Sequence, residues 1–418
     1  MFKAAILLAL SIFSIQAFAG GLQAYPSKEK QYTGNVKNFL MHQRNPKTKI
    51  LESFINTTNK ELVGESSTYD QALAGLGFLK LNDYEAAKGI LSFFREKWDG
   101  EGLHNFYNTQ TGLNGIEDTI HLGPNMWIAV FALQYGEITK DSSFSGFAKE
   151  IALWAVKLNH KNGGISMGPV CDWGGDWPNV YSSENNMVAY AVFKALKEKE
   201  EGVNMRSIFE KEMQGIVNFI NTVTLKKSDK GELTGVNVGY NPEEGISKIS
   251  SSDVVTMMLL VFDPDELNKF FSIREDALLK FAKDNFYVCE DEICGFDFTT
   301  KASADLVQRP RMISLEWSAQ MADAEIFLSQ FYKKTTGAGE KAENYLKESA
   351  KLLSDIDKKA IYEGDMNFFP YATKGSARPF PFASWWKTPE GDTKNCGALS
   401  PTLWRFFAYK KFNPLQLK

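Results

Sequence analysis

The sequence has few of the residues that bind metal ions or crosslink small domains. Only four histidines and four cysteines occur among its 418 residues. Zinc-protease HExxH motifs, phosphate-binding loops, dinucleotide fingerprints and EF-hand spacings are also missing. We therefore expect neither a catalytic metal nor a cofactor.

The chain also lacks an apolar run that would suggest a membrane span near its start. The apolar residues 4–15 are too few, because a spanning helix needs about 20 residues. This run follows Lys3 and precedes the small-x-small site Ala17-Phe18-Ala19, which is typical of a signal peptide. We therefore expect residues 1–19 to be removed from an exported protein, periplasmic or extracellular, that begins near Gly20.

An excess of basic residues is missing as well. The formal net charge is −4, whereas binding to nucleic acid phosphates needs a concentrated basic face. We find no Pro/Ser-rich linker, low-complexity tract or block of like charge. The sequence therefore predicts one domain over residues 20–418, with no nucleic acid partner, and we expect a monomer.

The few cysteines that are present include one close pair. Cys289 and Cys294 enclose four residues, which in an oxidising compartment is typical of a small disulfide loop. Zinc is less favoured, because the spacing is not Cys-x-x-Cys and no histidine is near in the sequence. Cys171 and Cys396 lie in long predicted loops, where a second bridge is possible but does not follow from the sequence.

Apolar helices that begin in a similar way dominate the rest of the chain. Hydroxyl or proline residues precede each apolar run, and an acid often follows in the first turn, where the helix dipole favours negative charge. The starts are Ser67-Thr68-Tyr69-Asp70, Gly123-Pro124-Asn125, Ser182-Ser183-Glu184, Ser251-Ser252-Asp253, Leu315-Glu316-Trp317 and Leu399-Ser400-Pro401-Thr402. We expect these starts to meet at one mouth.

Amphipathic helical patterns alternate with these apolar ones. The links from an apolar helix to the next amphipathic helix are mostly short, while the links in the other direction mostly exceed twenty residues. Residues 36–56 are also roughly helical, although Pro46 interrupts the pattern. The sequence therefore predicts an all-α fold, a double ring of six helical hairpins with long loops on one face.

The chain resembles the six-hairpin glycosidase group, whose catalytic domains are (α/α)6 toroids. The resemblance covers nearly the whole mature chain. It implies a glycoside hydrolase that acts on an oligo- or polysaccharide, more often with inversion than retention. The segments that carry it are residues 67–73, 123–127, 183–190, Glu316-Trp317-Ser318-Ala319-Gln320, Phe369-Pro370-Tyr371-Ala372-Thr373 and residues 399–402.

Four acids at the starts of the apolar helices are the candidate catalytic residues. Glycoside hydrolysis needs one protonated carboxyl group as acid and one ionised carboxylate as base or nucleophile. A helix N-terminus stabilises a carboxylate, whereas apolar aromatic surroundings raise its pKa. Glu184 as acid and Asp70 as base form the first pair, although the roles are interchangeable, and Asp253 and Glu316 are the reserves.

Aromatic and polar residues near the expected mouth are the candidate sugar-binding residues. An aromatic ring offers a flat apolar face to a sugar, and tyrosine and tryptophan add a polar edge. The candidates are Tyr69, Gln71, His121, Asn125, Trp127, Trp173, Trp177, Asn185, Tyr190, Trp317, Tyr371, Trp385 and Trp386.

Two other functions remain open from the sequence. A polysaccharide lyase on the same toroid would bind a uronate through Asn125 or Asn185 and would use His121 or Tyr190 as base. A glycan-binding envelope protein would have kept the toroid without its chemistry. Ultraviolet-absorbing products would identify the lyase, and binding without turnover would identify the binding protein.

Overall fold

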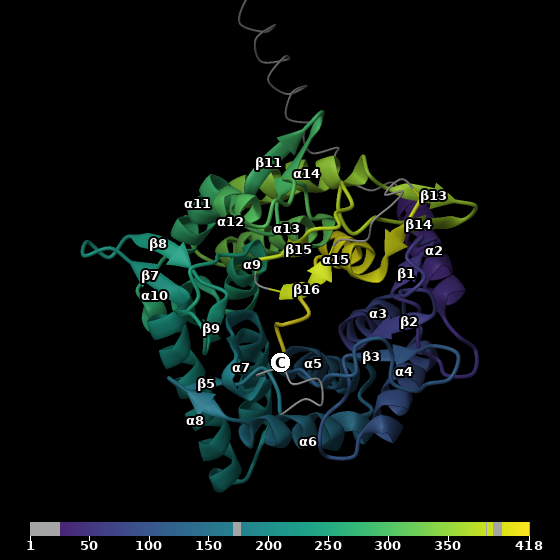
Figure 1. Cartoon of the computed structure of the whole chain (residues 1–418), viewed down its shortest axis with the longest axis horizontal. Helices are drawn as coiled ribbons and strands as arrows, with labels where there is room; N and C mark the ends of the chain where they lie inside the picture. The colour runs from purple at the N-terminus through teal and green to yellow at the C-terminus, as the bar shows by residue number, and fades with distance from the viewer. Residues whose placement is uncertain (1–25, 170–176, 382, 388–394, 418) are drawn as a thin grey trace, which may run out of the picture.

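The structure is a computed structural model that describes residues 26–169, 177–381, 383–387 and 395–417. The predicted signal peptide lies outside these residues, as do Cys171 and Trp173. Figure 1 shows a double ring of helices around a common axis. The predicted all-α toroid is confirmed.

Six helices form the inner ring. Each one contacts the next, and the last contacts the first, so the ring is closed (Figure 1). Their order around the ring is α3 (Thr68–Lys80), α5 (Leu122–Thr139), α7 (Ser183–Lys199), α9 (Ser252–Val261), α13 (Leu315–Lys333) and α15 (Leu399–Lys410). They begin at, or within two residues of, the six predicted starts.

Amphipathic helices surround this ring and complete the hairpins. The first described helix packs on the last, so the sixth hairpin joins residues from distant parts of the sequence. The outer helices are α2 (Pro26–Gln43), α4 (Tyr84–Lys97), α6 (Ser145–Val156), α8 (Val203–Phe219), α10 (Pro264–Phe271), α11 (Glu275–Phe286) and α14 (Gly339–Asp357). The short α12 (Lys301–Leu306) lies in the loop before α13.

The inner helices are apolar because both sides of each helix are covered. In α5 no charged residue occurs from Leu122 to Tyr135, and Trp127 and Phe131 are almost fully buried. A Cβ atom at Gly75 of α3 would lie only 2.0 Å from the Phe131 ring. Glycine at this position therefore allows α3 and α5 to pack closely.

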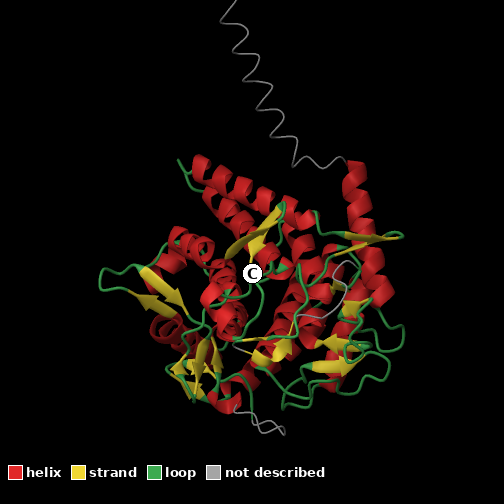
Figure 2. Cartoon of the chain, turned by 45° about the horizontal axis from the view of Figure 1, so that its top comes forward, coloured by secondary structure: helices red, strands yellow, loops and turns green. Residues whose placement is uncertain are grey.

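Short strands connect the long loops to one another, and Figure 2 shows them as small pairs around the helical body. Strands β2, β6 and β17 lead directly into α3, α7 and α15, so strand pairing fixes where these helices begin. The pairs are β1 (Phe54–Ile55) with β17 (Gly397–Ala398), β2 (Glu65–Ser67) with β3 (Phe106–Asn108), β4 (His160–Lys161) with β5 (Gly164–Ile165), β6 (Tyr181–Ser182) with β9 (Gly239–Asn241), β9 with β10 (Gly245–Ile246), β7 (Leu225–Lys227) with β8 (Leu233–Val236), β11 (Tyr287–Glu290) with β12 (Ile293–Phe296), β13 (Ile361–Glu363) with β14 (Met366–Phe368), and β15 (Pro379–Phe380) with β16 (Ala383–Lys387).

The far end of the ring, at the C-termini of the inner helices, is covered by residues 412–417. Asn413 and Gln416 each donate a side-chain hydrogen bond of 2.8 Å to the carbonyl oxygen of Leu260 in α9. Gln134 of α5 donates one of 2.9 Å to the Pro414 carbonyl oxygen. This segment therefore satisfies helix-end carbonyl groups and forms a floor under the ring.

The helical prediction for residues 36–56 is wrong in its second half. Helix α2 ends at Gln43, and Phe54-Ile55 forms strand β1. The side-chain Oδ1 of Asn45 accepts hydrogen bonds from the backbone N–H groups of Lys47 and Thr48, at 2.8 and 3.2 Å. This turn surrounds Pro46, whose missing N–H cannot continue a helix.

The predicted disulfide between Cys289 and Cys294 is confirmed. The two residues face each other in the β11–β12 hairpin.

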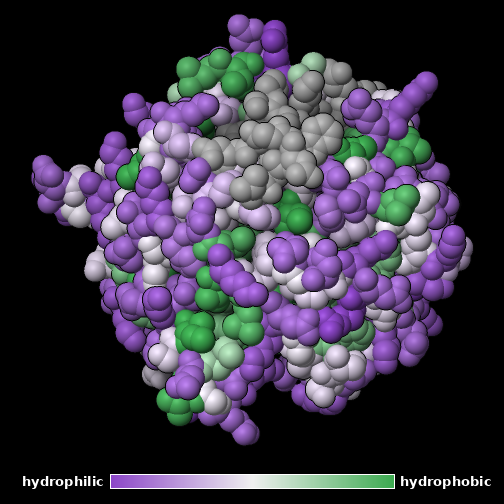
Figure 3. All heavy atoms as spheres, turned by 60° about the horizontal axis from the view of Figure 1, so that its bottom comes forward, coloured by the Kyte–Doolittle hydropathy of each residue, from purple (hydrophilic) through white to green (hydrophobic). Residues whose placement is uncertain are grey.

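The face drawn in Figure 3 is mainly hydrophilic, with hydrophobic residues in small groups. Among the described residues, no helix combines the length and apolar character needed to cross a membrane.

Candidate active site

A cavity of about 270 Å³ lies where the inner helices begin. All six inner helices contribute side chains or backbone to its wall. The four acids noted in the sequence, Asp70, Glu184, Asp253 and Glu316, each occupy the first turn of a different helix and all line this cavity. The expected gathering of these acids at one mouth is therefore present in the structure.

Glu316 is the most firmly held of the four. Its side chain is buried, and its two oxygens accept hydrogen bonds of 2.8 Å from the hydroxyls of Tyr69 and Ser400. Burial raises the pKa of Glu316 to about 8, although both hydroxyls act in the opposite direction. Trp404 Nε1 donates to the Tyr69 hydroxyl at 2.7 Å, so the Tyr69 ring is itself fixed.

Glu184 stands at the cavity wall with a raised pKa of about 8. The largest cause is burial, and the negative charges of Asp253 and Glu316 add to it. The nearby indole of Trp127 acts in the opposite direction. A carboxyl group with this pKa is mostly protonated at pH 7 and can donate its proton.

Asp253 and Asp70 differ in the hydrogen bonds that they accept. Burial raises the pKa of Asp253 to about 6, while the Ser251 hydroxyl and backbone N–H groups at the start of α9 lower it. Burial raises the pKa of Asp70 to about 7, and the Ser53 hydroxyl lowers it. Asp253 is therefore the member of the four that is most readily ionised at neutral pH.

His121 lines the same cavity at the start of α5. Its side chain is buried, and burial lowers its pKa to about 4, so the ring is uncharged at neutral pH. Within the described part of the chain, its Nε2 atom has no hydrogen-bond partner. One face of the cavity thus carries an uncharged ring nitrogen that a ligand hydroxyl could satisfy.

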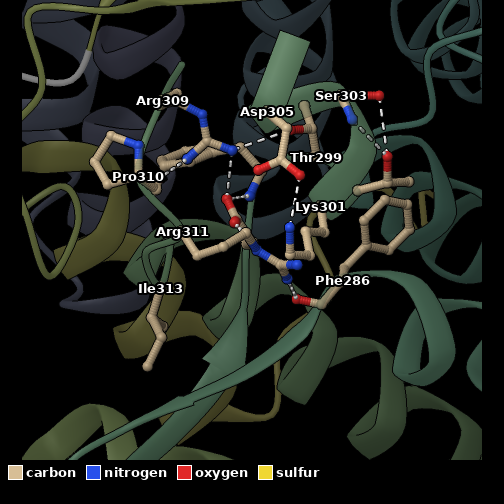
Figure 4. A network of polar contacts seen from close by, with 12 residues as sticks. Phe286, Thr299, Lys301, Ser303, Asp305, Arg309, Pro310, Arg311 and Ile313 are labelled. Carbon is tan, nitrogen blue, oxygen red and sulfur yellow. Dashed lines mark hydrogen bonds and ion pairs between the residues drawn. The ribbon is translucent and has the colours of Figure 1, made fainter. Parts of the chain in front are cut away.

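Aromatic rings line part of the cavity, and one of them, Trp317, is supported by a buried ion cluster. Figure 4 shows Arg309 and Arg311 converging on one carboxylate, which is that of Asp297. The Arg309 guanidinium also lies 5.8 Å from the ring centre of Phe298, which meets the Trp317 ring edge-on at 4.8 Å. Because Trp317 lines the cavity, the ion cluster helps to hold that wall in place.

Most of the predicted sugar-binding residues with described side chains line a cavity. Six of them line the cavity with the acids: Tyr69, His121, Trp127, Asn185, Trp317 and Tyr371. Trp177 lines an adjacent cavity. Trp173 lies outside the described residues, and for Trp385 and Trp386 the structure describes only the backbone, in β16.

Three predicted binding residues do not line these cavities, which corrects the sequence interpretation. Gln71 and Asn125 are fully buried, and each pairs its side-chain amide with both backbone groups of one residue, Leu51 and Leu103 respectively. Tyr190 is buried against Phe262. These side chains attach loops to the ring or fill the core.

The sequence interpretation also missed residues in the cavity wall. Glu117 is a fifth lining acid, and burial raises its pKa. It comes from the long loop before α5, where no helix start marks an acid in the sequence. Ser400 lies at a helix start that has no acid in its first turn, yet its hydroxyl donates a hydrogen bond to Glu316.

The architecture is an (α/α)6 toroid. The similar solved structures include a D-mannose isomerase, with a TM-score of 0.62 and 12% identity over 93% of this chain and 99% of that chain. A cellobiose 2-epimerase from Bacillus thermoamylovorans gives a TM-score of 0.60 and 11% identity over 90% and 97% of the two chains. A glycosidase variant in complex with glucose gives 0.58 and 9% over 94% and 99%.

At these identities the likeness establishes the fold only. A scan against protein-family models and a search of curated protein sequences give no match. Within the described residues, no group of three or more His, Cys, Asp or Glu side chains is arranged to hold a metal ion.

Proposed function

We propose that this protein is a glycoside hydrolase that cleaves an oligo- or polysaccharide with inversion at the anomeric carbon. The observation that carries the proposal is the meeting of four carboxyl groups, from four inner helices, around one cavity. Glycoside hydrolysis needs a protonated and an ionised carboxyl group on either side of the bond. Near neutral pH, a pKa of about 8 keeps Glu184 mostly protonated, and a pKa of about 6 leaves Asp253 mostly ionised.

Glu184 is the general acid in this proposal and Asp253 is the general base. Protonated Glu184 transfers its proton to the glycosidic oxygen as the bond to the anomeric carbon breaks. Asp253 removes a proton from a water molecule, which attacks that carbon from the opposite face. Asp70 was the base favoured by the sequence, but the hydrogen bonds to Asp253 support its ionised form better.

Tyr69, Ser400 and Glu316 hold the sugar in the orientation that this reaction needs. The hydroxyls of Tyr69 and Ser400 fix both oxygens of Glu316, so the carboxyl group presents a constant position to substrate hydroxyls. The uncharged His121 ring accepts or donates one further hydrogen bond. Rigid positioning of this kind lowers the entropic part of the barrier.

The proposal includes export of a mature single-domain chain that begins near Gly20. The Cys289–Cys294 disulfide supports it, because such bonds persist mainly in oxidising compartments. The apolar run and small-residue site of residues 1–19 support it from the sequence.

Sugar epimerisation or isomerisation is the second candidate. It is favoured by the similar solved structures, which include a mannose isomerase and cellobiose 2-epimerases. Such a reaction moves a proton next to a carbonyl group and adds no water. The lyase alternative has less support, because none of the described residues lining the cavity is a lysine or arginine that could bind a uronate.

A product screen against glycans in H2 18O tests the proposal and separates the two candidates. A hydrolase gives shorter products with one added 18O atom, whereas an epimerase or isomerase leaves the mass of its substrate unchanged. We expect Glu184→Gln and Asp253→Asn each to lower kcat by about 10²- to 10⁴-fold. Glu85→Gln, an exposed acid in the first turn of an outer helix, is the matched control. Full activity in both cavity variants would contradict the proposal.

A further inference from the structure

A second cavity, of about 470 Å³, adjoins the one that contains the four acids. The two cavities share Met167, Glu184, Asn185 and Asp253 in their walls. The proposed acid and base therefore stand at the boundary between the two spaces. A bond positioned between these carboxyl groups would have one part of the glycan in each cavity.

Loop and strand residues form most of the wall of the second cavity, the outer cavity. Residues of the inner helices form most of the wall of the first, the inner cavity. Trp177, Tyr181 and Tyr240 contribute aromatic rings to the wall of the outer cavity. Tyr181 and Tyr240 are paired between strands β6 and β9, and their rings meet edge-on with centres 6.0 Å apart. Trp177 and Tyr240 are partly exposed, and a flat ring with a polar edge suits the apolar face of a sugar.

The charge of the second cavity is negative. Glu243 and Glu244 line it from the β9–β10 turn. None of its described lining residues is a lysine or an arginine. Both are exposed, and neither takes part in an ion pair with another described residue. The nearby Lys161 is engaged with Tyr240, to whose hydroxyl it donates a hydrogen bond of 2.5 Å.

His121 marks the passage between the two spaces. Its ring lines the inner cavity and meets the ring of Trp177, in the outer cavity, at 4.8 Å. The buried Nε2 atom of His121 has no hydrogen-bond partner among the described residues. A buried polar atom without a partner is costly, and a ligand hydroxyl in the passage would satisfy it.

We propose that the outer cavity binds the leaving part of the glycan and selects a sugar that carries an ammonium group. The carboxylates of Glu243 and Glu244 attract an amino sugar and repel a uronic acid, since like charges at an interface disfavour the wrong partner. The inference rests on the proposed hydrolase function, because that function decides which part of the glycan leaves from the outer cavity. Its selectivity for charge is independent of turnover.

Binding of three monosaccharides tests this selectivity. Glucosamine, glucose and glucuronate share one ring and differ in the charge of a substituent, and tryptophan fluorescence or calorimetry at low salt gives their Kd values. We expect the full-length protein to bind glucosamine more tightly than glucuronate, with glucose between them. Glu243→Gln/Glu244→Gln should weaken glucosamine binding about 2- to 5-fold, the range of exposed ion pairs, and leave glucose binding unchanged.

The control is Glu340→Gln, an exposed acid at the start of outer helix α14. Glucuronate binding as tight as glucosamine binding, no saturable glucosamine binding, or an unchanged preference in the double variant would each overturn the inference. A different result would contradict the proposed function, namely full activity of the Glu184→Gln and Asp253→Asn variants. A charge preference that survives in those circumstances would leave the outer cavity as a binding site on a different enzyme.

Discussion

The hydroxyl of Tyr69 donates a 2.8 Å hydrogen bond to Oε1 of Glu316, and this bond joins inner helices α3 and α13 across the cavity. The same hydroxyl accepts a hydrogen bond from Trp404 of α15. One oxygen atom therefore connects three helices of the ring. Burial together with the charge of Glu316 keeps the pKa of Tyr69 well above its usual value, so the hydroxyl remains a donor.

Replacement of this hydroxyl should destabilise the fold. Tyr69→Phe leaves the Trp404 indole N–H without its acceptor, and a buried group without a partner costs about 1–3 kcal/mol. We expect a decrease of that size in the free energy of unfolding measured with denaturant. Tyr362→Phe, at a side chain that is 71% exposed, is the control and should leave stability unchanged. Equal stability of the two variants would contradict the prediction.

The pH dependence of activity should be bell-shaped with a maximum near pH 7. Asp253 must lose its proton to act as base, so activity rises through its pKa of about 6. Glu184 must keep its proton to act as acid, so activity falls as the pH passes its pKa of about 8. The profile of kcat/KM against pH is the measurement. A rate that keeps rising beyond pH 9 would exclude Glu184 as the acid.

A small substitution at Gly123 should impair activity with little loss of secondary structure. A Cβ atom at this position would lie 2.3 Å from Oδ1 of Asn185, whose side chain lies in the wall of both cavities. We expect Gly123→Ala to displace the Asn185 amide and lower kcat/KM about 10-fold or more. Gly146→Ala, where a Cβ atom meets nothing within 4 Å, is the control. Steady-state kinetics and circular dichroism together check this expectation.

Asp323 of α13 should make the protein less stable as the pH rises. Its side chain is buried, neither oxygen has a hydrogen-bond partner among the described residues, and burial raises its pKa well above the usual value of 3.8. Well below pH 3.8 the group is protonated in both states. Above that pH only the unfolded chain releases the proton, so the free energy of unfolding falls.

Asp323→Asn removes this titration and keeps the size of the side chain. We expect the free energy of unfolding of the wild-type protein to fall, relative to that of the variant, between pH 4 and pH 7. Denaturant titrations at several pH values measure the difference between the two proteins. Parallel pH profiles would show that the Asp323 carboxyl group is not held protonated in the folded chain.

The ring of helices could be predicted because its pattern is local. The alternation of apolar and amphipathic segments, together with short links such as residues 81–83 and 262–263, is visible in the sequence and determines the hairpins. The short strands could not be predicted in the same way. Strands such as β1 and β17 pair residues more than 300 positions apart, and two or three residues carry no periodic signal.

The acids that line the cavity could be predicted from their position at helix starts. The role of the side-chain amides at similar positions could not be predicted. Asp70 and Glu184 follow directly from the helix starts, since helix N-termini converge in a toroid. Gln71, Asn125 and Asn186 have similar positions, yet each binds both backbone groups of a single residue in a neighbouring loop. A sugar hydroxyl and a peptide group present the same donors and acceptors, so only the coordinates distinguish the two roles.

The segment of residues 412–417 has a consequence for how this protein should be handled. It covers the end of the ring opposite the acids, where it contacts the C-terminal parts of α5 and α9. Deletion of residues 412–417 would remove Leu415 from the interior and expose the ends of α5 and α9 to water. Changes to this segment would therefore disturb the base of the ring, at the end opposite the acids.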